Sequence, residues 1–75
     1  MNLKRKQIIK DIIGKILDNN NIEIRFNNKE IEIICNTICY SNFHYLHDIL
    51  KYKENIEIIG IIHENHSLCI IGEIK

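Results

Sequence analysis

Residues 22–35 read IEIRFNNKEIEIIC, and this stretch decides the fold class. Apolar and charged residues alternate with a period of two on both sides of an Asn-rich centre, which predicts a β-hairpin with one buried and one wet face. A turn at residues 28–29 sets Arg25 opposite Glu32, whereas a turn one residue earlier sets Glu23 opposite Glu32. Cross-strand charge pairing favours the turn at 28–29. The predicted buried face carries Ile22, Ile24, Phe26, Ile31, Ile33 and Cys35.

A helix is predicted before the hairpin, over residues 3–17. Its apolar residues recur at the spacing of one broad helical stripe. They are Ile8, Ile9, Ile12, Ile13, Ile16 and Leu17. Asn2 can cap the start, and the polar run at 18–21 can end the helix because Asp and Asn tolerate turn geometry. Gly14, inside the helix, indicates either close approach of another backbone or simple tolerance of a glycine.

The same order of elements follows the hairpin. Residues 41–53 predict a second helix, which Ser41 or Asn42 can cap. Its apolar face carries Phe43, Leu46, Ile49 and Leu50, with Tyr45 and Tyr52 beside it. Residues 55–62 and 67–74 then predict two further strands. The fold class is therefore α+β, of order αββαββ: a two-layer structure with a four-stranded, mostly antiparallel sheet and two helices on one face.

The 75 residues form one domain, with a pseudo-repeat of residues 1–35 and 41–75 in the order of elements. Short sequence matches between the two halves are no better than chance in so Ile-rich a chain.

The second strand pair differs from the first because both of its faces are apolar. With a loop at residues 64–66, Ile59 and Ile61 share one face with Cys69 and Ile71. Two helices cover only one side of such a sheet, so we predict that the other side is an interface with a second copy or a partner protein. The predicted interface residues are Ile34, Ile59, Ile61, Cys69 and Ile71. The alternative is a β-bulge at Gly60, or curled strands that the second helix and the termini shield.

Composition limits the partners and the compartment. Ten basic and ten acidic residues give a formal net charge of zero, so no global field draws the chain to nucleic acid or an anionic membrane. Abundant Ile, Asn and Lys without Pro or Trp indicate an A+T-rich genome, common among low-GC bacteria, phages, other mobile elements and some parasites. Three cysteines, no signal-peptide pattern and no membrane-spanning run predict a cytoplasmic protein that does not enter a membrane.

Few residues suggest chemistry. Cys35, Cys39, His44 and His47 are zinc-type ligands, but their spacing matches no recognised site and Cys35 belongs to the hairpin's buried face, so we predict no metal and no cofactor. The three glycines lie far apart and form no phosphate-binding loop, and no nucleophile motif is present, so we expect no enzyme.

A basic cluster on the first helix is a further candidate, and its members are Lys4, Arg5, Lys6, Lys10 and Lys15. The ordinary interpretation is a solvated helix face, and the functional one is contact with nucleic-acid phosphates. The absence of aromatic residues on the wet face of the hairpin argues against RNA.

The predicted function is a small non-enzymatic binding protein. We expect stoichiometric protein–protein interaction by a homodimer, as in a phage or mobile-element inhibitor of a host defence protein. One alternative is a nucleic-acid-binding module that uses the first helix. Another is a protein that sequesters a small ligand or signal nucleotide at a dimer interface.

Overall fold

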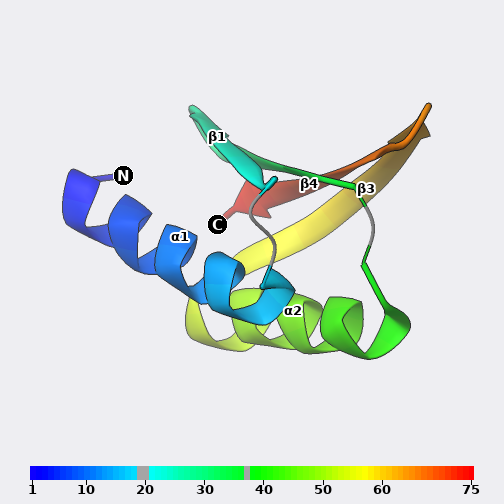
Figure 1. Cartoon of the computed structure of the whole chain (residues 1–75). Helices are drawn as coiled ribbons and strands as arrows, with labels where there is room; N and C mark the ends of the chain where they lie inside the picture. Colours follow the sequence, from blue (N-terminus) through cyan, green and yellow to red (C-terminus); the bar gives the residue numbers. More distant parts are fainter. Residues whose placement is uncertain (19–20, 37) are drawn as a thin grey trace.

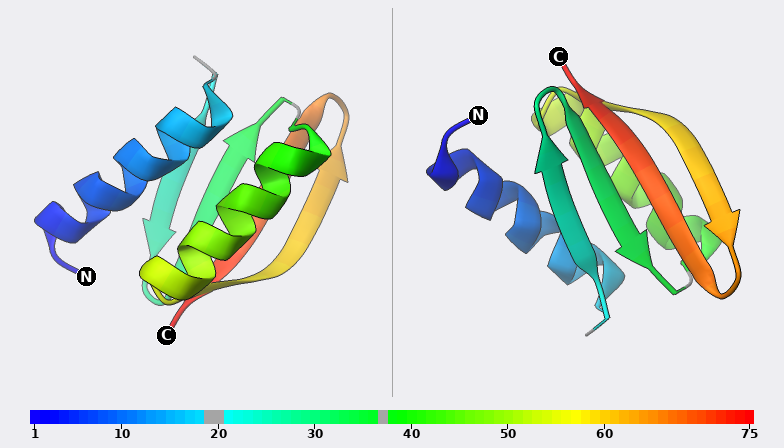
Figure 2. Two further views of the ribbon diagram at one scale, coloured as in Figure 1. Left: turned by 90° about the horizontal axis from the view of Figure 1, so that it is seen from below. Right: turned by 90° about the horizontal axis from the view of Figure 1, so that it is seen from above.

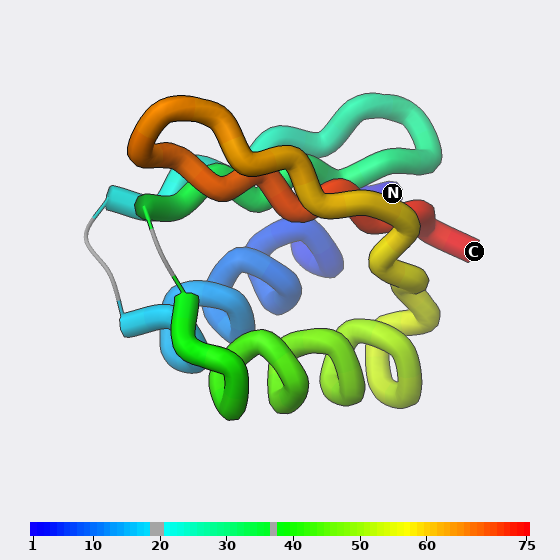
Figure 3. The backbone as a smooth tube through the Cα atoms, turned by 90° about the vertical axis from the view of Figure 1, so that its right-hand side faces the viewer, coloured from blue at the N-terminus to red at the C-terminus, as the bar shows by residue number. Residues whose placement is uncertain are grey.

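The computed structural model describes residues 1–18, 21–36 and 38–75, and its fold is α+β (Figure 1). The elements are α1 (Leu3–Leu17), β1 (Glu23–Asn27), β2 (Glu30–Cys35), α2 (Tyr40–Lys53), β3 (Ile56–Glu64) and β4 (Ser67–Ile74). The strands form one antiparallel sheet in the order β1-β2-β4-β3. Both helices lie on the same side of this sheet (Figure 3). The predicted class and element order are confirmed.

The strand order joins the two halves of the chain through their second strands. β2 pairs with β4 at the centre, so β1 and β3 are the two edges of the sheet (Figure 2). Each helix–strand–strand half thus contributes one edge strand and one central strand. The two edges have different sequences, and this difference matters for the site below.

The register of the first hairpin is the one that charge pairing favours. Asn27 pairs with Glu30 and Arg25 pairs with Glu32, so the turn consists of residues 28–29. Asn28 adopts a φ of 53°, in the left-handed region that asparagine tolerates. The guanidinium of Arg25 forms its ion pair along its own strand, 3.0 Å from the Glu23 carboxylate, rather than across to Glu32.

The first helix begins and ends as predicted in the part that the structure describes. The Asn2 side chain accepts a hydrogen bond of 2.8 Å from the backbone N–H of Arg5, which confirms the predicted N-cap. Asp18 ends α1 in the left-handed conformation. The rest of the predicted ending, at Asn19 and Asn20, lies outside the described residues. A Cβ built on Gly14 meets nothing within 4 Å, so this glycine is simply tolerated.

The second helix begins one residue earlier than predicted, at Tyr40. Its N-cap is Cys39, which forms no side-chain capping hydrogen bond. The prediction that Ser41 or Asn42 caps this helix is therefore wrong, because both residues already lie inside the first turn.

The core lies between the helices and the sheet face that they cover, which we call the inner face. Its fully buried side chains come from all the elements except β1. They are Ile9, Ile13, Ile31, Ile33, Leu46, Leu50, Ile56 and Ile70, with Cys35 beside them. No polar side chain among the described residues is buried with them. Neither α1 nor α2 covers the opposite face of the sheet, which we call the outer face (Figure 3).

Candidate functional site

A one-residue bulge in β3 decides which side chains reach each face of the second hairpin. Ile58 pairs with Gly72, but the next pair is Gly60 with Ile71, so Ile59 is an extra residue. Glu64 pairs with Ser67, which makes the turn two residues long instead of the predicted three. The structure therefore contains the β-bulge beside Gly60 that the alternative interpretation of the sequence predicted.

The bulge shifts the register of β3 by one residue between its start and the turn. Ile61 pairs with Ile70 and so lies on the inner face, while Ile62 pairs with Cys69 on the outer face. The prediction that Ile61 shares a face with Cys69 and Ile71 is wrong, because a one-residue shift turns every later side chain to the other face. Ile62, and not Ile61, is the residue of β3 that lies beside Cys69 on the outer face.

Half-exposed isoleucines mark the free edge of β3. Ile59, Ile61 and Ile62 are 50%, 49% and 47% exposed. The tip of the β3–β4 hairpin extends past the start of α2 (Figure 1), which agrees with the exposure of Ile61 on the inner face. Residues 58–62 form an uncharged stretch, which we call the β3 edge. A long apolar edge strand is a template for pairing with another chain.

The outer face next to this edge is also apolar. Ile34, Cys69 and Ile62 form one row across β2, β4 and β3, and Ile71 lies in the neighbouring row. We call these four residues the outer patch. Ile34, Cys69 and Ile71 are half-buried, so they remain in partial contact with solvent. The outer patch and the β3 edge together contain all five predicted interface residues, although Ile61 lies on the inner face.

The fold separates charges that cancel in the sequence. Six of the ten acidic residues lie on strands, and the pairing places all six on the outer face. They are Glu23, Glu30, Glu32, Glu57, Glu64 and Glu73. Seven of the ten basic residues lie on the two helices, with only two acidic residues among them. The sheet side is therefore acidic and the helix side basic, despite the zero net charge.

The structure does not bring the predicted basic cluster onto one face of α1. A helix turns by about 100° per residue, which sets Lys4 and Lys15 nearly opposite Lys6 and Lys10. Two members are also engaged within the molecule. Arg5 donates a hydrogen bond of 2.5 Å to the Glu54 carbonyl, and the Lys6 ammonium lies 5.5 Å from the centre of the Phe26 ring.

The cysteines and histidines do not form a cluster. In the part of the chain that the structure describes, no three His, Cys, Asp or Glu side chains could hold a metal ion together. Cys35 is buried in the core and Cys39 is exposed at the start of α2. His44 and His47 both lie beside Asp48, at 3.6 and 3.2 Å.

The three thiols differ in acidity. Burial raises the pKa of Cys35, and burial, aided by the nearby Glu32 carboxylate, raises the pKa of Cys69. A hydrogen bond with the Ser41 hydroxyl lowers the pKa of the exposed Cys39.

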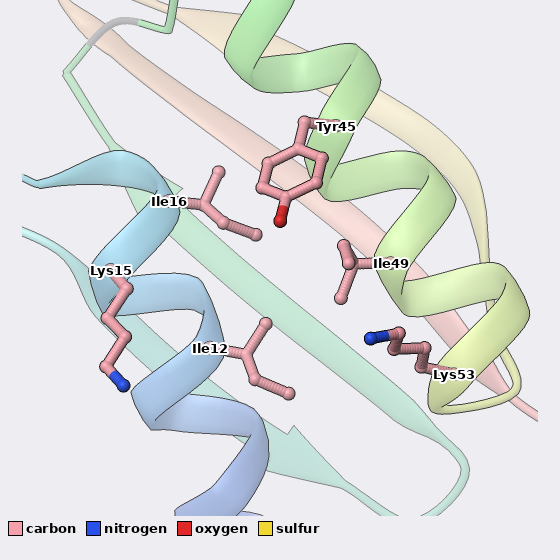
Figure 4. A pocket seen from close by; sticks show the side chains of 6 residues that line it. All are labelled: Ile12, Lys15, Ile16, Tyr45, Ile49 and Lys53. Atoms are coloured by element: carbon pink, nitrogen blue, oxygen red, sulfur yellow. The ribbon is translucent and has the colours of Figure 1, made fainter.

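A groove of about 300 Å³ separates the two helices on the basic side of the molecule (Figure 4). Its lining residues are Ile12, Lys15, Ile16, Tyr45, Ile49 and Lys53. Sequence reasoning missed this groove because Ile12, Ile16 and Ile49 fit the pattern of core positions. The basic residues at the same turns of the helices were the only signal of a site.

Among the described residues, neither helix has the length and apolar character that a membrane crossing requires. No protein-family model, curated protein or solved structure matches this chain.

Proposed function

We propose that this protein acts by stoichiometric binding to other protein chains, without catalysis, and that the β3 edge is where it binds. The observation that carries the proposal is the row of half-exposed isoleucines, Ile59, Ile61 and Ile62, in an uncharged edge strand. Isolated exposed isoleucines are ordinary, but a contiguous set on unpaired backbone favours association. The first partner that we propose is a second copy of the chain.

Pairing between edges fits the exposed residues better than stacking of outer faces. The bulge leaves Ile61 on one face and Ile62 on the other, and only a strand added at the edge can cover both. Stacking two outer faces would bring their glutamates together, and like charges in contact oppose association. We therefore propose that two β3 strands pair antiparallel and extend the sheet across a two-fold axis.

The register of this pairing follows from the faces. Paired residues of an antiparallel ladder share a face, so the axis passes through a residue of the regular segment after the bulge. An axis at Ile61 sets the two Ile61 side chains together on the inner face and Ile62 opposite Gly60 on the outer face. A Cβ built on Gly60 meets nothing within 4 Å, so the space beside this glycine can accept the isoleucine of the second copy.

Light scattering after size exclusion tests this proposal. Wild type is expected at twice the 8.9-kDa mass of the chain, and Ile61→Lys at the mass of one chain, because a lysine at a paired edge blocks its partner. Leu3→Lys is the matched control: it makes the same kind of change at an exposed apolar residue of α1 and should stay dimeric. A wild type that is monomeric at all concentrations would refute the proposed dimer. A dimeric Ile61→Lys variant would refute the β3 edge as its interface.

Disulfide trapping tests the register separately. In a Cys39→Ser background, Ile61→Cys should cross-link two chains on mild oxidation, because directly opposed Cβ atoms come close enough for a disulfide. Leu3→Cys in the same background should remain uncross-linked at the same protein concentration. Efficient cross-linking of Leu3→Cys alone would contradict the proposed arrangement.

For the biological target we propose a host protein that the dimer blocks in the cytoplasm, in the manner of a phage or mobile-element inhibitor. The amino-acid composition, which indicates an A+T-rich genome, and the small size of the chain support this source. The acidic outer face favours a target with a basic rim around an apolar centre. Capture of one host protein by wild type in moderate salt, lost in Ile62→Lys and kept in Leu3→Lys, is the expected result. Equal capture by both variants would contradict it.

A further inference from the structure

The groove between α1 and α2 combines an apolar surface with two polar groups directed into it. Ile12 and Ile16 face Ile49 across the gap (Figure 4). The Tyr45 hydroxyl and the Lys53 ammonium also point into the gap, whereas the Lys15 side chain runs along α1 on its side away from α2 (Figure 4). An apolar pocket with a few convergent polar groups is the usual form of a small-molecule site.

The polar groups of the groove are available to a ligand. No ion pair or hydrogen bond from any other described residue engages Lys53 or the Tyr45 hydroxyl. Lys53 follows Tyr45 by eight positions on α2, which puts them about 12 Å apart along the helix. One end of the groove is therefore cationic, and the other is walled by a phenol ring.

Charge and size together define the ligand class. The groove opens on the side of the molecule that carries seven of the ten basic residues, so an anion is favoured over a cation. The volume of about 300 Å³ equals that of about ten water molecules at about 30 Å³ each. A ligand of about ten non-hydrogen atoms with one carboxylate and a hydrocarbon chain matches both quantities.

We propose that this groove binds an aliphatic monocarboxylate of medium chain length. Lys53 holds the carboxylate, and the hydrocarbon chain lies over Ile12, Ile16 and Ile49 against the ring of Tyr45. The site lies on the helix side, opposite the outer face of the sheet, so it does not depend on the proposed association through β3.

Titration of the full-length ¹⁵N-labelled protein with octanoate, followed by amide chemical shifts, tests the site. Shifts are expected to saturate and to centre on Ile12, Ile16 and Ile49. Octanol and octylamine have the same chain without the negative charge, and both should bind at least tenfold more weakly. Equal binding of octylamine, or shifts centred on the β3 edge, would overturn the proposal.

Two lysines of α2 provide a matched pair of variants. Lys53→Met keeps the aliphatic stem and removes the ammonium group, and it should weaken octanoate binding at least tenfold. Lys51→Met makes the same change at an exposed lysine that does not line the groove, and it should leave binding unchanged. Equal losses in both variants would overturn the assignment of Lys53. If the amide chemical shifts of the groove residues change when the protein concentration is raised without octanoate, a second copy of the chain fills the groove instead, which would overturn the proposal.

Discussion

Two glycines of this chain should respond in opposite directions to the same added methyl group. Gly72 lies in β4, where an ideal Cβ would be 2.8 Å from the Cγ2 atoms of both Ile31 and Ile56. Each methyl group would have to move by about 0.6 Å to reach the close limit of normal contacts, 3.4 Å. Both isoleucines are fully buried, so neither can move toward solvent. Gly14 has nothing within 4 Å of its ideal Cβ.

The two substitutions can be given magnitudes. Overpacking a filled core costs about 1–3 kcal/mol, and the lower backbone entropy of alanine in the unfolded chain offsets about 0.4–1 kcal/mol of this. We expect Gly72→Ala to lower the free energy of unfolding by about 1–2 kcal/mol. Gly14→Ala should raise it by about 0.8–1 kcal/mol, because alanine is the better residue inside a helix.

Urea unfolding followed by far-ultraviolet circular dichroism measures this difference. With a slope of about 1 kcal/mol per molar urea, the two midpoints should differ by about 2–3 M. All variants need the same protein concentration, since association would couple to unfolding. A Gly72→Ala midpoint at or above that of wild type would refute the steric argument. A Gly14→Ala midpoint below that of wild type would refute the claim that a methyl group at residue 14 has free space around it.

Two further predictions concern the stability of the folded chain. Burial raises the pKa of the Cys35 and Cys69 thiols, so above about pH 8.5 the unfolded chain loses these protons first and the free energy of unfolding falls as the pH rises. Urea midpoints between pH 7 and 9.5 should show this fall. A Cys35→Ala/Cys69→Ala variant whose urea midpoint falls equally steeply with pH would contradict the prediction. Arg5→Ala should lower stability by about 1 kcal/mol, because it removes the hydrogen bond to the half-buried Glu54 at the end of α2. Lys4→Ala, at the exposed neighbouring residue, should change the urea midpoint little. Equal shifts of the midpoint in the two variants would contradict the claim that the hydrogen bond of Arg5 stabilises the fold.

The first hairpin was predictable down to its register because two signals agree there. The alternation of residues 22–35 fixes which side chains face the core, and Arg25 distinguishes two turns that differ by one residue. The charges on β2 mark the outer face without ambiguity. The start of α2 was predicted less well, because Cys39 and Tyr40 carry no capping signal.

The second hairpin was predictable only in part because isoleucine occupies both faces of β3. The predicted register holds from Ile56 to Ile58 and fails beyond the bulge. Residues 58–62 contain no polar side chain that would mark the solvent-facing side of the strand, so the sequence does not reveal a one-residue shift in register. The separation of charge was equally hidden, since it arises only when the pairing brings the glutamates of all four strands onto one face. The groove required the spacing of the two helices, which no local pattern encodes.

The pairing of β2 with β4 has a consequence for synthesis on the ribosome. The first half of the chain can form α1 and its hairpin before β4 exists, and during that interval β2 is itself an unpaired edge. Nascent chains with open apolar edges are prone to misassembly. Glu30 and Glu32 alternate with the buried isoleucines of β2, and charges in this position act as gatekeepers against pairing with the wrong strand. We expect the glutamates of this central strand to protect the growing chain in this way until its own β4 has been synthesised.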